Sequence, residues 1–209
     1  MTGLPRGRVA MTALLAAVVM AGALLASDAL RTSGFIRPPA AAWMRVPAAL
    51  SASTRVEPEI PERIAIPALS VSALVVAVGK DATGGVAVPE DISTVGWYSA
   101  SERLGSPLGT TVIVGHRDGR DVGAGAFYEL EKLSSGDRVL VAGDGAATSF
   151  TVREVLLVPK EDFAQVSPQV FSSKGTGRVV LVSCGGEFDY SLGSYESNVI
   201  VIAYPTPAN

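Results

Sequence analysis

Short apolar runs separated by turns dominate the chain beyond residue 62. The runs are rich in Val, Ile and Thr, and glycine or proline stands between many of them, which is typical of β-strands. About eight short strands with little helix favour an all-β fold, a closed or nearly closed barrel. Gly143, Asp144 and Gly145 lie between two adjacent runs and predict a hairpin there. The predicted strands are 63–67, 71–78, 86–88, 110–116, 137–143, 148–158, 178–184 and 198–204.

Two short segments carry a weak helical signal, at 127–133 and 161–166. We expect Pro168 to end the second, because proline lacks the amide proton that a helix interior needs. Trp97 and Tyr98 lie between predicted strands. Large aromatic side chains are usually buried, which favours core packing over contact with a substrate for these two residues.

A different kind of apolar segment stands near the start of the chain. Residues 9–26 contain no charge over 18 residues, enough for a helix to cross a bilayer core. Arg6 and Arg8 precede this segment, so we predict a single transmembrane anchor at the cell membrane with residues 1–8 in the cytoplasm. A cleaved signal peptide is the alternative, because Ala21-Gly22-Ala23 offers a small-x-small cleavage site.

The remaining chain divides into two parts, both expected outside the cytoplasm. Residues 27–60 are rich in proline and alanine without a sustained period, which predicts a stalk. Residues 61–205 are numerous enough to form one domain with its own hydrophobic core.

The net charge and the small number of possible metal-binding residues exclude several functions. The chain has 17 Lys and Arg against 20 Asp and Glu, a net charge of -3 that argues against nucleic acid as a partner. One His and one Cys exclude an intrachain disulfide and an ordinary zinc site. The carboxylates of Asp118, Asp121, Glu129 and Glu131 lack EF-hand spacing and favour a solvated surface over a calcium site. We therefore predict no metal and no cofactor.

The sole histidine and the sole cysteine stand in similar positions. His116 ends the predicted strand 110–116, and Cys184 ends the predicted strand 178–184. Strand ends are where rigid scaffolds present reactive groups, and a cysteine beside an imidazole is the minimal nucleophile and base of acyl transfer. Taken singly, each has an ordinary interpretation, a small buried thiol and a hydrogen-bonded imidazole.

Three segments together carry a family resemblance: VIVGHRD, GAFYELEKLSSGDRVLV and VVLVSCGGEFDYSLGSYESNVIVIAY. They resemble the sortases, within them the class F type of actinobacteria, a group of Gram-positive bacteria. The marks are a Gly-His strand end, Phe-x-x-Leu before a Gly-Asp-x-Val strand, a Ser-Cys-Gly-Gly motif and a terminal Tyr-x-x-Asn-Val-x-Val strand. The resemblance covers the whole predicted domain and fits a membrane-tethered design.

The resemblance implies an eight-stranded sortase-type β-barrel with cysteine transpeptidase activity. Cys184 would attack the Thr-Gly carbonyl of a Leu-Pro-x-Thr-Gly-like (LPXTG-like) sorting signal on a secreted protein and form a thioacyl enzyme. His116 would protonate the leaving amine and then deprotonate an incoming amine from a cell-wall peptide precursor or another protein. The reactive form would be the thiolate–imidazolium pair.

One expected residue is missing. The family places an arginine between the cysteine and the end of the last strand, and this chain has neither Arg nor Lys after Cys184. The family position falls near Gly193 to Glu196. Losing a preorganised oxyanion donor typically slows catalysis by about 10²–10³-fold. The alternative donors, each with an ordinary structural interpretation, are Arg117, Arg120, Arg103, Tyr195, Asn198 and the backbone amide of Gly185.

Two functional hypotheses follow. The favoured one is an active membrane-anchored transpeptidase; the alternative is a non-catalytic sortase-fold module that binds peptides. An L,D-transpeptidase is disfavoured, because its Ser-x-Gly-Cys-x-Arg signature does not match Val182-Ser183-Cys184-Gly185-Gly186.

Overall fold

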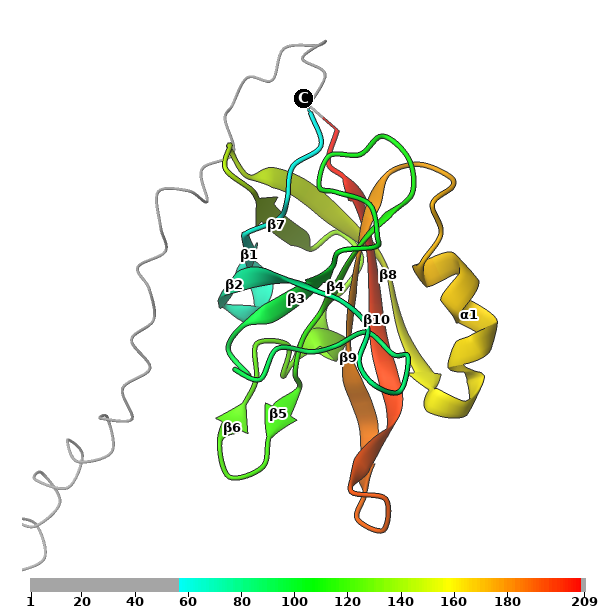
Figure 1. Ribbon diagram of the computed structural model, residues 1–209. Coiled ribbons are helices and arrows are strands. Elements are labelled where there is room, and N and C mark those ends of the chain that lie inside the picture. Colours follow the sequence, from blue (N-terminus) through cyan, green and yellow to red (C-terminus); the bar gives the residue numbers. More distant parts are fainter. Residues whose placement is uncertain (1–56, 208–209) are drawn as a thin grey trace, which may run out of the picture. The chain divides into compact units, whose positions relative to one another are not determined.

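A computed structural model of the chain describes residues 57–207 (Figure 1). The predicted cytoplasmic segment 1–8, the transmembrane anchor 9–26 and nearly all of the stalk 27–60 lie outside the described residues. Within the described range, no helix is both long and apolar enough to span a membrane.

Eight strands close into a barrel in the order β1-β2-β3-β4-β9-β10-β8-β7, and β1 pairs with β7 to complete it. This confirms the eight-stranded barrel expected from the sequence. Most neighbours are antiparallel, including the predicted β7–β8 hairpin, whereas β2–β3 and β4–β9 are parallel. The barrel strands are β1 Arg63–Ile66, β2 Val71–Val78, β3 Val95–Tyr98, β4 Thr110–Val114, β7 Arg138–Ala142, β8 Thr148–Pro159, β9 Arg178–Asp189 and β10 Ser194–Pro205.

The smaller elements surround the barrel. A two-stranded sheet of β5 Asp118–Gly119 and β6 Gly123–Ala124 projects from the same end as the β9–β10 hairpin (Figure 1). Three 3-10 turns are η2 Pro67–Leu69, η3 Leu130–Lys132 and η4 Lys160–Asp162, and the one described α-helix is α1 Phe163–Val170.

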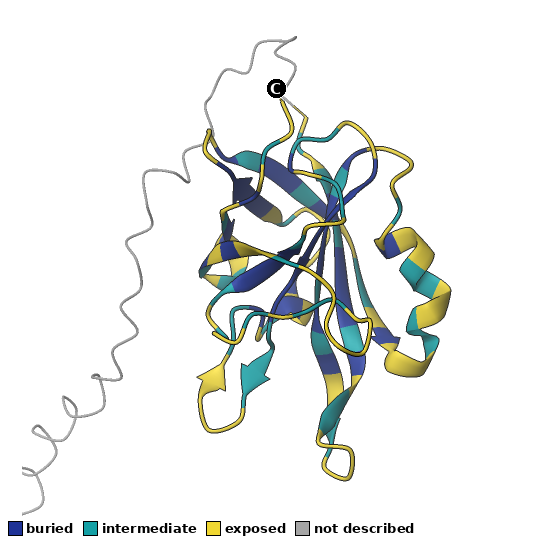
Figure 2. Ribbon diagram, in the orientation of Figure 1, coloured by how far each residue is buried: buried dark blue, intermediate teal, exposed yellow. Residues whose placement is uncertain are grey.

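The two faces of the barrel wall explain its continuous apolar strands. On β9, Val179 and Leu181 join the main core cluster, whereas Val180 joins a second cluster with Val170 of α1. Successive side chains of a strand point to opposite faces, so a wall covered on both sides is apolar at successive positions. Buried residues accordingly run along the barrel strands in Figure 2.

The predicted strand at 86–88 is wrong. Val86 forms only an isolated bridge with Lys80, and the third barrel strand is instead Val95–Tyr98. Pro89 follows the predicted run directly and cannot donate to a ladder, which limits pairing there. Trp97 is buried in the main core, as expected, and its indole N–H donates to the Glu102 carbonyl.

The helical segments also depart from expectation. Only η3 forms within the predicted 127–133 helix. Pro168 lies inside α1 rather than ending it. Pro168 has no amide proton to donate to the Ala164 carbonyl, one helical turn earlier. The Ser167 hydroxyl donates to that carbonyl instead, at 3.2 Å.

Candidate active site

The parallel pairing of β4 with β9 aligns the two predicted site residues. Its register runs from Thr110↔Arg178 to Val114↔Val182, a constant offset of 68 residues. The Gly115 amide then donates to the Val182 carbonyl at 3.0 Å, so the ladder continues beyond β4. His116 and Cys184 have the same offset and therefore lie side by side, His116 two residues beyond the end of β4 and Cys184 within β9.

Cys184 lies within β9, not at its end as the sequence predicted. β9 continues to Asp189, because the residues after Cys184 keep pairing with β10. Gly186 has φ +77, a conformation that suits glycine, beside the register shift between Tyr195 and Ser197. The thiol is free and partly exposed, and Asn198 lies directly opposite it in β10.

Hydrogen bonds hold both the side chain and the main chain of His116. Its Nε2 atom lies 2.9 Å from the carbonyl oxygen of Pro89. Its own carbonyl accepts the Phe127 amide at 3.0 Å, and the Gly125 amide donates to the Arg117 carbonyl at 2.7 Å. A Cβ at Gly125 would lie 2.4 Å from the His116 carbonyl oxygen, so this close approach requires glycine.

Both predicted residues line one pocket of about 1130 Å³. One wall comes from the segment after β4 and the small β5–β6 sheet, together with Tyr128. The other comes from Cys184 and the extended ends of β9 and β10. The lining residues are 116–121, 123–124, 128, 184, 188, 190 and 193–195.

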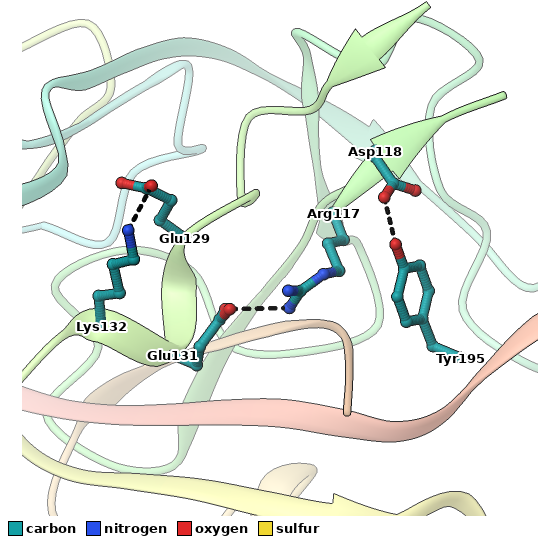
Figure 3. Close-up of polar contacts among 6 residues, drawn as sticks. All are labelled: Arg117, Asp118, Glu129, Glu131, Lys132 and Tyr195. Carbon is teal, nitrogen blue, oxygen red and sulfur yellow. Dashed lines mark hydrogen bonds and ion pairs between the residues drawn. The ribbon is translucent and has the colours of Figure 1, made fainter. Parts of the chain in front are cut away.

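Two polar contacts connect or anchor these walls (Figure 3). The Tyr195 hydroxyl of β10 donates to the Asp118 carboxylate of β5. Arg117 forms an ion pair with Glu131, with 2.9 Å between Nη1 and Oε1. Its guanidinium also lies over the rings of Tyr195 and Tyr128, 5.2 and 5.7 Å from their centroids.

These contacts shift two pKa values in the pocket. The hydrogen bond to Asp118, followed by burial, raises the pKa of Tyr195, so its hydroxyl stays protonated as a donor near neutral pH. Burial acts to lower the pKa of Arg117, but Glu131 and Tyr195 outweigh it and raise that pKa. An arginine is cationic in proteins in any case, and these contacts favour that form further.

An aromatic cluster lines the β9–β10 wall. The Phe188 ring meets the Tyr190 and Tyr195 rings edge to face, each with 5.1 Å between centroids. Tyr190 is 90% exposed, so this wall presents apolar ring surface to the pocket mouth. The pocket can thus hold a peptide against aromatic rings beside a thiol and an imidazole.

The other sequence candidates lie in different places. Arg120 lines the pocket and is exposed, whereas Arg103 is not among the pocket residues. Glu196, near the position of the missing arginine, is also exposed and outside the lining. Within residues 57–207, no three His, Cys, Asp or Glu side chains gather closely enough to hold a metal ion.

Sequence reasoning missed the contacts that hold this site together. The Pro89 carbonyl is a backbone group and leaves no mark in the residue pattern. Asp118 and Tyr195 are 77 residues apart. Each stands in a sequence segment that looks like an ordinary surface loop. The one available signal was the position of Asp118, two residues after His116.

Comparison with known proteins identifies the fold and the family. The sortase domain family model matches residues 64–206. No curated protein sequence matches the chain.

Several solved structures have the same fold. Sortase E1 from Streptomyces coelicolor with a tripeptide in the active site aligns with a TM-score of 0.54 at 20% identity, over 71% of this chain and 89% of that one. Sortase A from Corynebacterium diphtheriae, a lid mutant, gives 0.53 at 18% identity over 74% of each chain. Sortase C-1 from Actinomyces oris gives 0.52 at 23% identity over 73% and 76%.

Proposed function

This chain belongs to the sortase family, a family of cysteine transpeptidases, and from that premise we propose that it is an active transpeptidase of the class F type. The observation that carries the proposal is the shared register of the sole histidine and sole cysteine at one pocket. The class F assignment is supported by the segments around His116, Cys184 and Asn198 that resemble that class.

The reaction begins when the Cys184 thiolate attacks the Thr carbonyl of an LPXTG-like sorting signal. The Thr–Gly C–N bond breaks, His116 gives its proton to the leaving Gly amine, and the acyl group stays on sulfur as a thioester. An incoming amine then attacks the thioester, His116 takes its proton, and the thiolate is released. No metal, oxidant or cofactor enters this balance.

Pro89 supports the proton transfers of His116. A carbonyl oxygen only accepts, so the Nε2–H of His116 donates to it at 2.9 Å. This bond orients the ring and leaves Nδ1 as the nitrogen that exchanges protons, just as an orienting acceptor does in other nucleophile–histidine sites.

The proposed partners are secreted proteins with an LPXTG-like C-terminal sorting signal and an amine acceptor on the cell wall. The charge-free segment 9–26 supports a membrane anchor that would hold the enzyme where secreted proteins emerge. The N-terminus would be cytoplasmic and the catalytic domain extracytoplasmic.

A product assay tests this function. The full chain is mixed with a Leu-Pro-x-Thr-Gly peptide library, with and without triglycine, and the products are identified by mass spectrometry. We expect cleavage after Thr and a triglycine-capped product, both abolished by Cys184→Ala. Cleavage that persists in Cys184→Ala would contradict the proposal.

A non-catalytic peptide-binding module is the second candidate function. It is favoured by the absence of Arg and Lys after Cys184 and by the exposed carboxylate of Glu196. A folded chain that binds library peptides, yet neither cleaves them nor forms a covalent adduct, would establish this function instead.

A further inference from the structure

Acyl transfer at Cys184 needs a hydrogen-bond donor for the oxyanion. When the thiolate attacks a carbonyl carbon, negative charge develops on its oxygen, and a preorganised donor in the pocket stabilises the transition state. The segment after Cys184 contains no Arg or Lys, and Glu196 lies outside the pocket lining. A cationic donor must therefore come from another element.

Arg117 has the position and the rigidity for this role. It follows His116 directly and lines the same pocket as Cys184. Its side chain is only 19% exposed, and Glu131 holds one end of the guanidinium in an ion pair at 2.9 Å. Figure 3 shows the guanidinium between Glu131 and the Tyr195 ring.

The surrounding contacts leave donor capacity on Arg117. A guanidinium carries five N–H donors in a fixed plane, more than its two side-chain partners, Glu131 at Nη1 and Tyr195, can occupy. The Tyr195 ring over this plane is itself fixed by its hydroxyl bond to Asp118. The cation is thus oriented before substrate arrives, which is the condition for effective charge stabilisation.

The other arginines named from the sequence fit less well. Arg120 lines the pocket but is exposed, so water screens its charge. Arg103 is exposed and is not among the lining residues. Neither has the enclosing aromatic rings and ion pair of Arg117.

We propose that Arg117 is a catalytic residue that donates hydrogen bonds to the oxyanion formed when Cys184 attacks a carbonyl. This inference rests on the proposed acyl-transfer function. The cation that stabilises the oxyanion would then come from the segment after His116 and not from the last strand, where the family places its arginine. Glu131, Tyr195 and Asp118 are its positioning residues.

Two reactions of Cys184 separate this role from a structural one. With p-nitrophenyl acetate, the thiolate attacks the acetyl carbonyl, an oxyanion forms, and p-nitrophenolate leaves to give S-acetyl Cys184. With iodoacetamide, the thiolate displaces iodide from a saturated carbon, and no oxyanion forms. Both rates are measured on the full chain by intact mass, with Cys184→Ala as the blank.

Arg117→Gln is expected to slow acetylation by about 10²–10³-fold, the usual effect of removing one oxyanion donor, while the alkylation rate changes little. Arg117→Lys should recover part of the loss, because it restores the charge without the planar fork. The matched control, Arg103→Gln, also removes one arginine charge, and it should acetylate at the parent rate.

Three results would overturn the assignment: unchanged acetylation in Arg117→Gln, equal slowing of both reactions, or equal losses in Arg117→Gln and Arg103→Gln. If Arg117→Gln does not fold, Arg117→Met decides, because it also removes the donor: acetylation that is not slowed relative to alkylation then overturns the assignment. Arg117-dependent acetylation in a chain that cleaves no library peptide would support Arg117 and reject the proposed substrate class. A parent chain that is alkylated but never acetylated would overturn both proposals.

Discussion

The Nε2 atom of His116 lies 2.9 Å from the carbonyl oxygen of Pro89, a residue 27 positions earlier in the chain. The contact joins the segment before β3 to the loop after β4, and it assigns different tasks to the two ring nitrogens. Nε2 donates its proton to the carbonyl, which leaves Nδ1 free for the proton exchange of the proposed acyl transfer.

The first prediction concerns the tautomer of His116. Because a carbonyl cannot donate, neutral His116 should carry its proton on Nε2. The chain has one histidine, so a two-dimensional ¹H–¹⁵N spectrum of the imidazole reports this residue alone. A neutral ring protonated on Nδ1 would contradict the role given to Pro89.

The second prediction concerns the close approach of Gly125 to His116. A Cβ there would lie 2.4 Å from the His116 carbonyl oxygen and 3.0 Å from its Cβ, so Gly125→Ala must displace the histidine. We expect a loss of about 1–3 kcal/mol in unfolding free energy, as for other overpacked sites, together with slower acylation of Cys184.

Gly79→Ala is the matched control for this substitution. A Cβ at Gly79 meets nothing within 4 Å, so its unfolding free energy should stay within about 0.5 kcal/mol of the parent in denaturant titration. Equal effects of the two substitutions would show that the approach to His116 is unimportant.

The third prediction concerns the titration of Tyr195. Its hydrogen bond to Asp118, then burial and the Asp118 charge, raise its pKa, whereas Arg117 opposes them. The phenolate of Tyr195 should therefore form above the ordinary tyrosine pKa of about 10. Asp118→Asn removes the negative charge and should lower the pKa of Tyr195 relative to the parent.

The same shift has a consequence for stability. A folded-state pKa above the unfolded value favours folding fully below about pH 10, and this contribution is lost as the pH rises through the folded pKa.

Subtracting the absorbance titration of Tyr195→Phe from the parent isolates Tyr195 among the five tyrosines. Identical Tyr195 titrations in the parent and Asp118→Asn would refute the contact.

Much of the barrel could be predicted because its strands pack on both faces and read as apolar runs. The prediction failed where composition was ambiguous: 86–88 contains two valines but stands before Pro89, whereas 95–98 begins with Val95 and contains the buried Trp97. Which of the two segments becomes a barrel strand depends on its pairing with neighbouring strands, and the apolar run alone does not reveal that pairing.

The candidate site was predictable only in part. His116 and Cys184 could be found because each is the sole residue of its type and lies in a recognisable segment. The extension of β9 past Cys184 could not be predicted, because Gly185 and Gly186 look like a turn. In the structure Gly185 pairs with Ser197, and β9 continues beyond the bulge at Gly186. The ion pair of Arg117 with Glu131 depends on how the loop after β4 folds back toward η3.

The proposed function requires that Cys184 form a thioester with a peptide carbonyl. The full chain should be mixed with the Leu-Pro-x-Thr-Gly library without an added amine, quenched in acid and measured by intact mass and peptide mapping. We predict a peptidyl mass on Cys184 that hydroxylamine removes and that His116→Ala strongly reduces. A folded parent chain with a reactive thiol but no hydroxylamine-sensitive adduct on Cys184 would contradict the proposed function.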